Sequence, residues 1–118
     1  MGSSYTGIVE KGAGRGGALG FPTINIPLSD PNLSGTYAGR VRAGGASYPA
    51  ALYADTRRKI FEAHLIEFSD DLYGKTVTIE ILEKIRGDMQ FANDEIARAA
   101  IAEDVRRVKE YFKKLPQS

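Results

Sequence analysis

Short extended segments that alternate with turns most constrain the fold of this chain. Six segments rich in β-forming residues occupy positions 5–11, 22–28, 36–43, 47–54, 59–68 and 75–85. Residues 29–35 form a loop by their Ser, Asp, Pro, Asn and Gly content. Gly44-Gly45 separates two of the extended segments, which is a strong signal for a β-hairpin. Short strands and frequent turns of this kind predict an antiparallel barrel or sandwich.

The periodicity changes after Gly87, where apolar residues begin to recur every three or four positions. This spacing predicts an amphipathic helix over about 93–114, with Asn93 as its N-cap and Pro116 beyond its end. We therefore expect a single domain over residues 1–118, mainly β, in which one C-terminal helix closes a small barrel. The apolar stripe of the helix consists of Ala97, Ile101, Val105, Val108 and Phe112.

Composition excludes several classes of protein. The chain has 118 residues, no cysteine, and 16 Lys and Arg against 15 Asp and Glu. A disulfide framework and a thiolate metal site are therefore impossible, and the balanced charge does not indicate a basic surface that binds nucleic acid. No apolar run is long enough to span a bilayer, and no signal-peptide pattern opens the sequence. We expect a cytoplasmic protein, monomeric, that binds small molecules and neither nucleic acid nor a membrane.

Residues 12–17, GAGRGG, match the pattern G-x-G-x-x-G. A dinucleotide-binding fingerprint requires a helix at this point, but Phe-Pro-Thr-Ile-Asn-Ile follows and reads as a strand. Such a loop can still direct backbone N–H groups at phosphates. Thr23 and Asn25 lie two positions apart on the extended segment, so their side chains share a face. Their oxygens suit Mg²⁺ when phosphates supply the other ligands, whereas the alternative is that they cap a turn or lie on a solvated strand face.

Glu62 and His64 show the same two-residue spacing within the segment 59–68, on a face that also carries Ile60, Ile66 and Phe68. A carboxylate among apolar residues tends to have a shifted pKa and is a candidate general base. The alternatives are that an arginine pairs with Glu62 and that His64 is a hydrogen-bonded core residue.

The junction between the last strand and the helix carries a cation, Arg86, and an aromatic residue, Phe91. These two residues are candidates for contact with a ligand. The alternative is a plain strand-to-helix connection in which Phe91 packs as a hydrophobic staple before the helix.

Several of these motifs together resemble the riboflavin kinase family, which includes the kinase module of bifunctional FAD synthetases. The family pattern G-x-V-x-x-G-x-x-x-G, followed by L-G-F-P-T-A-N, corresponds to Gly7, Val9, Gly12 and Gly16 and then to residues 19–25. Residues 34–41, SGTYAGRV, and the long segment 61–96, which contains F-E-A-H and D-L-Y-G, resemble further blocks of the family. The resemblance extends over nearly the whole chain.

The resemblance implies a six-stranded antiparallel Greek-key β-barrel with a C-terminal helix. It also implies a Mg²⁺-dependent kinase that transfers the γ-phosphate of ATP to the 5′-hydroxyl of riboflavin, giving FMN. Thr23 and Asn25 would bind Mg²⁺ and phosphates, Glu62 would be the catalytic base, and Arg86 and Phe91 would lie on the flavin side. The alternative is a non-catalytic flavin- or nucleotide-binding module of the same barrel family. The nucleotide and phosphate would be bound by Gly12, Gly14, Arg15, Gly16, Gly20, Thr23 and Asn25.

The sequence departs from the family pattern at Ile24, which replaces the usual Ala, and at two further places. Gly17-Ala18 stands where family members usually carry a second basic residue before Leu-Gly-Phe-Pro. The family's Asn-Ile-Gly…Pro-Thr stretch is replaced by the shorter segment ALYADTRRKIFEAH, residues 51–64. These two further departures lie on the side of the site where the nucleotide is expected.

Overall fold

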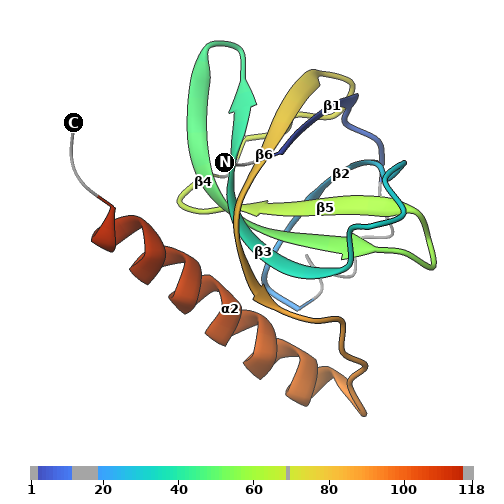
Figure 1. Cartoon of the computed structure of the whole chain (residues 1–118), viewed down its shortest axis with the longest axis vertical. Helices are drawn as coiled ribbons and strands as arrows, with labels where there is room; N and C mark the ends of the chain where they lie inside the picture. Colours follow the sequence, from blue (N-terminus) through green and yellow to red (C-terminus); the bar gives the residue numbers. More distant parts are fainter. Residues whose placement is uncertain (1–2, 12–18, 69, 116–118) are drawn as a thin grey trace.

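The computed structural model describes residues 3–11, 19–68 and 70–115, which form one antiparallel sheet and one helix. Along the sheet the strand order is β1-β6-β3-β4-β5-β2, so the strands at its two edges are consecutive in the chain (Figure 1). The strands are β1 (Ser4–Ile8), β2 (Ile24–Pro27), β3 (Gly35–Ala43), β4 (Ala46–Asp55), β5 (Ile60–Leu65) and β6 (Thr76–Arg86), and the helix is α2 (Asp94–Lys114).

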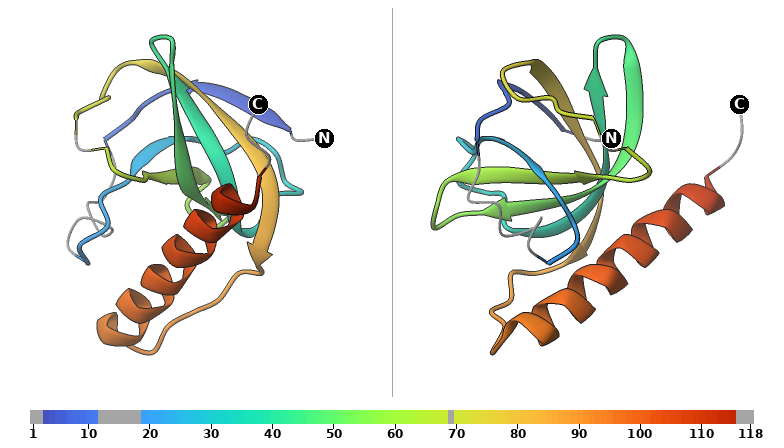
Figure 2. Two further views of the ribbon diagram at one scale, coloured as in Figure 1. Left: turned by 90° about the vertical axis from the view of Figure 1, so that its left-hand side faces the viewer. Right: turned by 180° about the vertical axis from the view of Figure 1, so that it is seen from behind.

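The two edges of the sheet meet and nearly close it into a barrel, as the two views in Figure 2 show. The backbone N–H of Glu10, just beyond β1, donates to the carbonyl of Asn25 on β2 at 2.8 Å. The six-stranded antiparallel barrel with a C-terminal helix is therefore confirmed. The predicted hairpin is also present, because Gly44 and Gly45 turn the chain between β3 and β4 with φ values of 57° and 86°.

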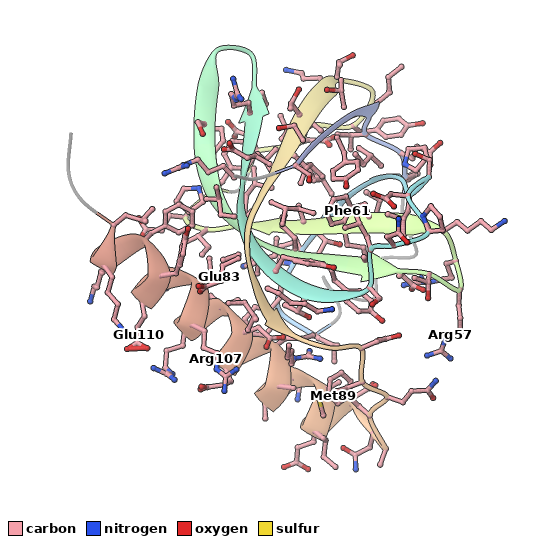
Figure 3. The ribbon with its side chains drawn as sticks, in the orientation of Figure 1. Arg57, Phe61, Glu83, Met89, Arg107 and Glu110 are labelled. Atoms are coloured by element: carbon pink, nitrogen blue, oxygen red, sulfur yellow. The ribbon has the colours of Figure 1, made fainter. Side chains whose placement is uncertain are left out.

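Alternate residues of the strands fill the barrel, as the period of two requires. On β5 the side chains of Phe61, Ala63 and Leu65 are buried, and Phe61 points into the interior (Figure 3). Glu62 and His64 alternate with them and therefore lie on the other face of the strand. The largest fully buried side chains are those of Phe61, Ile26, Leu52, Ile79, Val41, Val77 and Val108.

The predicted strand over 59–68 is too long at its end. β5 stops at Leu65, and Glu67 adopts a left-handed backbone with φ of 58°, which turns the chain away from the ladder. Ile66 consequently packs with the residues under α2, and the Phe68 ring packs at a tilt against Tyr48 with ring centroids 4.6 Å apart. The expected apolar row around Glu62 and His64 is therefore shorter than the sequence indicated.

Helix α2 packs against the outside of the barrel along β3, β4 and β6 (Figure 1). The buried residues Ala97, Val105 and Val108 confirm the predicted apolar stripe. Val105 and Val108 form a cluster with Ala38 on β3 and Ile66. The Asn93 side chain accepts a hydrogen bond from the Ile96 N–H at 2.9 Å, so the predicted N-cap is present. Among the described residues, no helix is apolar enough over a sufficient length to cross a membrane.

Candidate functional site

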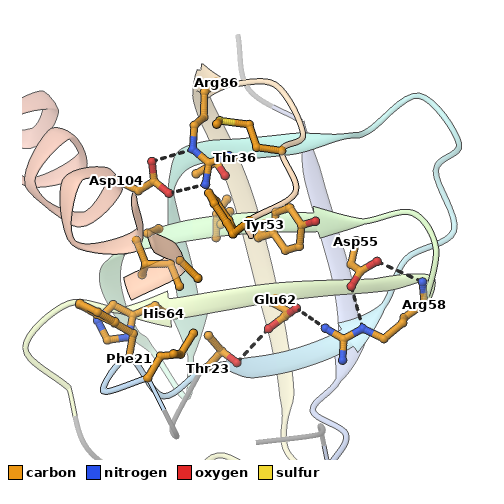
Figure 4. A pocket seen from close by; sticks show the side chains of 17 residues that line it. Phe21, Thr23, Thr36, Tyr53, Asp55, Arg58, Glu62, His64, Arg86 and Asp104 are labelled. Carbon is orange, nitrogen blue, oxygen red and sulfur yellow. Dashed lines mark hydrogen bonds and ion pairs between the residues drawn. The ribbon is translucent and has the colours of Figure 1, made fainter. Parts of the chain in front are cut away.

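A cavity of about 240 Å³ lies where the barrel meets the first turns of α2. Its wall combines barrel strands, the segment 19–23, the β6–α2 connection and the helix, so segments far apart in the sequence converge on it (Figure 4). Just over half of the lining residues are apolar or aromatic, and polar and charged side chains stand among them, as in many small-molecule sites. The residues on which the chemistry depends are Phe21, Thr23, Tyr53, Glu62, Arg86 and Phe91.

Glu62 is the best-positioned acid–base group in this cavity. It lies on β5 opposite Asn25 of β2, and its side chain is only 15% exposed. Thr23 Oγ1 donates to Glu62 Oε1 at 3.2 Å, and Arg58 Nη2 donates to Oε2 at 3.1 Å. Burial raises the pKa of Glu62, while the Arg58 charge and the Thr23 hydrogen bond act in the opposite direction without cancelling it. The result is a fixed carboxylate with increased basicity.

The arginine that pairs with Glu62 comes from the short turn between β4 and β5. Asp55, at the end of β4, accepts backbone N–H groups of Arg57 and Arg58, both at 3.1 Å, and this stabilises the turn. Its other oxygen accepts Arg58 Nε at 2.7 Å. Burial raises the pKa of Asp55, but the hydrogen bonds from Arg58 outweigh that effect and lower it overall. Our sequence analysis missed both residues, although an aspartate at a strand end three positions before an arginine is a recognisable turn signal.

Thr23 and Asn25 both lie beside Glu62, but in different surroundings. Thr23 precedes β2, is half-buried, and lines the cavity, whereas Asn25 is within β2 and only 7% exposed. Gly20 has φ of 92°, a conformation that favours glycine at this bend. Gly12, Gly14, Arg15 and Gly16, which we expect to bind phosphate, lie outside the described residues.

A second depression borders the same threonine. Its described lining includes Glu10, Lys11, Thr23, Asp71 and Tyr73, next to the point where the predicted phosphate loop begins. Thr23 is therefore shared by the two depressions. No described cluster of three His, Cys, Asp or Glu residues could hold a metal ion on protein ligands alone.

Arg86, at the end of β6, lies at the opposite side of the cavity from Glu62. Its Nε and Nη2 donate to the two oxygens of Asp104 on α2, at 3.0 and 2.8 Å. Its guanidinium also stacks over the Phe91 ring, 5.5 Å from the centroid, and Nη1 donates to the Gly87 carbonyl at 3.3 Å. Asp104 was missed from the sequence because its partner is 18 positions away and is brought to it only by helix packing.

The β6–α2 connection is tied to the barrel at a second point. Tyr53 on β4 donates its hydroxyl proton to Asp88 Oδ1 at 2.8 Å. Burial, together with this hydrogen bond, raises the pKa of Tyr53 to about 12. Phe91 and Met89 of this connection both line the cavity, and Met89 is 51% exposed.

His64 also lines the cavity, next to Glu62 on the same face of β5. Its Nδ1 lies 2.8 Å from the Pro22 carbonyl, and its ring meets Phe21 edge to face with centroids 5.5 Å apart. The histidine is therefore hydrogen-bonded, as expected, but it lies on the cavity wall and supports the segment 21–23 instead of filling the core.

The barrel therefore carries a cavity of a size that suits a small molecule, with a largely buried carboxylate in its wall. Comparison with known families makes this specific: the sequence model described as Flavokinase, riboflavin kinase, matches residues 2–112. The chain therefore belongs to the riboflavin kinase family.

Individual relatives agree with this assignment. The chain is 33% identical over 118 residues to the bifunctional riboflavin kinase/FMN adenylyltransferase of Escherichia coli K12, with 92% of this chain and 38% of that protein covered. It is 32% identical over 116 residues to the Haemophilus influenzae protein of the same name, covering 90% and 37%. The structure also matches riboflavin kinase from Trypanosoma brucei with a TM-score of 0.72 and 25% identity, covering 96% of this chain and 78% of that one. The chain thus spans less than two-fifths of the two bifunctional relatives.

Proposed function

We propose that this chain is a riboflavin kinase that transfers the γ-phosphate of ATP to the 5′-hydroxyl of riboflavin, giving FMN and ADP. The observation that carries this proposal is the position of Glu62. Its carboxylate lies in the wall of an apolar cavity and is hydrogen-bonded to Thr23, which also borders a second depression. A base at the junction of two binding regions suits a reaction between two small molecules.

Riboflavin occupies the cavity in this proposal, with its hydroxyl chain directed at Glu62. The flat isoalloxazine ring matches the aromatic and aliphatic wall, to which Phe21, Phe91 and Ile101 contribute. Arg86 and Phe91 contact the flavin side, as the family resemblance implies. The ion pair with Asp104 holds Arg86 in place for this contact.

ATP would approach from the depression that borders Thr23, with its phosphates near the backbone of the glycine loop. Gly12, Gly14, Arg15, Gly16 and Gly20 would surround these phosphates. Thr23 and Asn25 fit a Mg²⁺ site, because they offer hard oxygens and the Thr23 hydroxyl directs its proton to Glu62, leaving lone pairs for a cation. Bound there, Mg²⁺ would offset the negative charge of the transferred phosphoryl group.

The chemical step needs only proton removal and positioning from the protein. Glu62 accepts the proton of the riboflavin 5′-hydroxyl as that oxygen forms a bond to the γ-phosphorus. The bond between the γ-phosphorus and the oxygen bridging to the β-phosphate breaks, and ADP leaves with that electron pair. Arg58 and Thr23 keep the carboxylate oriented through this step.

Incubation with riboflavin and Mg·ATP, followed by chromatography of the flavins, tests the proposal. FMN is expected in the wild-type reaction, in an amount equal to the ADP released. Tight flavin binding without FMN formation would instead identify a non-catalytic flavin-binding module.

We further propose that the chain acts as a cytoplasmic monomer on small molecules, without nucleic acid or membrane partners. The near-equal numbers of acidic and basic residues support the absence of a nucleic-acid partner. The relatives are named as bifunctional, and any adenylyltransferase activity would require sequence outside the region matched here. Light scattering on the purified chain checks the monomer, since a stable dimer would double the mass.

A further inference from the structure

The cavity also contains a charged group to which the proposed function assigns no contact with a substrate. This group is the guanidinium of Arg58. Two arginines line the cavity among the described residues, Arg58 and Arg86, and three carboxylates accompany them, those of Asp55, Glu62 and Asp104. A phosphate formed next to Glu62 adds further negative charge at the end where Asp55 and Glu62 already lie. A cation from the protein at that end would offset this charge together with the proposed Mg²⁺.

The hydrogen bonds distinguish the two arginines. A guanidinium carries five N–H groups in a fixed plane. Arg86 uses its Nε and both terminal nitrogens on Asp104 and the Gly87 carbonyl. Arg58 uses Nε on Asp55 and Nη2 on Glu62, and among the described residues Nη1 has no acceptor. Its side chain is 43% exposed, so these N–H groups are accessible to a ligand.

The position of Arg58 relative to Glu62 makes the contact geometrically direct. A general base lies within about 2.6–3.2 Å of the oxygen whose proton it takes. The phosphorus that this oxygen attacks is one bond further, so the new phosphate forms beside Glu62. Arg58 Nη2 already lies 3.1 Å from Glu62 Oε2, and Figure 4 shows Glu62 between Thr23 and Arg58. Asp55 fixes the other edge of the guanidinium at 2.7 Å, so little ordering is needed on binding.

We propose that Arg58 binds the phosphate of the product FMN, and the phosphoryl group during transfer, through its free N–H groups. The proposal rests on the proposed function, since it presumes that a 5′-phosphorylated flavin occupies the cavity. It assigns a role to the short β4–β5 turn, where this sequence departs from the family pattern. It also supplies a cation for the phosphate in a sequence that has Gly17-Ala18 at the position of an expected basic residue.

Flavin titrations test this assignment without depending on turnover. Riboflavin and FMN are each titrated, in buffer containing Mg²⁺, into wild type, Arg58→Gln, Arg58→Lys and Lys59→Gln, with flavin fluorescence as the signal. Lys59 is the matched control, because it is the exposed neighbour of Arg58, lies outside the cavity lining and loses the same charge. Arg58→Gln is expected to weaken FMN binding about tenfold and leave riboflavin binding within about twofold, as loss of a charge-assisted hydrogen bond implies.

The other two variants separate the effect of the positive charge from the effect of the guanidinium shape, and control for the loss of a surface charge. Arg58→Lys keeps the charge but loses the planar fork, so it is expected to recover part of the FMN affinity, and Lys59→Gln is expected to behave as wild type. Equal weakening of both flavins in Arg58→Gln, or no change in either, overturns the inference and leaves the kinase proposal standing. A wild-type chain that binds neither flavin overturns both. Thermal unfolding of each variant verifies that the comparison is made between folded proteins.

Discussion

The two ends of the cavity are built differently, although both contain an arginine paired with a carboxylate. At one end, Glu62, Thr23 and Arg58 come from β5, the start of β2 and the β4–β5 turn, which are neighbours in the same sheet. At the other end, Arg86 on β6 meets Asp104 on α2, so the pair exists only when the helix packs on the barrel. In the proposed reaction, the first end would carry the chemistry within the sheet, and flavin binding at the second end would depend on how the helix packs.

The largest expected effect is on the rate at the Glu62 end. Glu62→Gln removes the proton acceptor while preserving the size of the side chain, and its single amide oxygen can still accept from one of the two donors, Thr23 or Arg58. We expect FMN formation to fall by about 10²- to 10⁴-fold, with riboflavin affinity little changed. Initial rates and a flavin titration measure the two quantities. Glu67→Gln, at an exposed position on the turn after β5, is the control, and a wild-type rate in Glu62→Gln would contradict the assigned role.

At the helix end, the expected effect is on stability and affinity together. Asp104→Ala leaves the Arg86 guanidinium, 18% exposed, without its carboxylate partner. Loss of one member of a buried ion pair costs about 3 kcal/mol, and we expect riboflavin to bind more weakly because Arg86 is released. Urea unfolding and a flavin titration measure both effects.

Glu103→Ala provides the matched control for Asp104→Ala. Glu103 is the neighbouring acid on α2, but its ion pairs with Arg106 and Arg107 face solvent. Little change in unfolding free energy or flavin affinity is expected there. Equal effects of the two substitutions would show that the Arg86–Asp104 pair has no special part in the site.

The hydrogen bond between Tyr53 and Asp88, which links the β6–α2 connection to the barrel, gives a smaller, pH-dependent effect on stability. Tyr53→Phe removes the hydrogen bond to Asp88 and is expected to cost about 1 kcal/mol near neutral pH. Because the folded state raises the pKa of Tyr53 to about 12, its contribution is fully present below pH 10 and is lost as the pH rises toward 12. The difference in unfolding free energy between wild type and Tyr53→Phe, measured across that range, checks the sign. A difference that grows with pH would contradict it.

The smallest expected effect lies at the start of α2. Asn93→Ala leaves the Ile96 N–H without its side-chain acceptor and is expected to cost about 0.5 kcal/mol. Asn93→Ser is the control, because serine retains a capping oxygen. If Asn93→Ala binds flavin more weakly than wild type and Asn93→Ser does not, the packing of the helix also affects ligand binding.

The difference between the two ends of the cavity also explains how much of the site the sequence could predict. The alternation of side chains along extended segments and the Gly44-Gly45 turn predicted the neighbouring strands. The two-residue spacing correctly placed Glu62 and His64 on one face of a strand. Local patterns carry that information, whereas Arg86–Asp104 is a contact between distant elements and depends on how the helix packs. Arg58 was missed for another reason: its local turn signal was present, but only the β2–β5 pairing brings its carboxylate partner next to Thr23. The roles of Thr23, Asn25, Glu62, Arg86 and Phe91 stay predictions.

Thr23 has a kinetic consequence, because it belongs to two depressions at once. In the proposed reaction, riboflavin and ATP would occupy these two depressions, on either side of one hydroxyl. Direct transfer of the phosphoryl group between them is then expected, without a phosphorylated form of the enzyme.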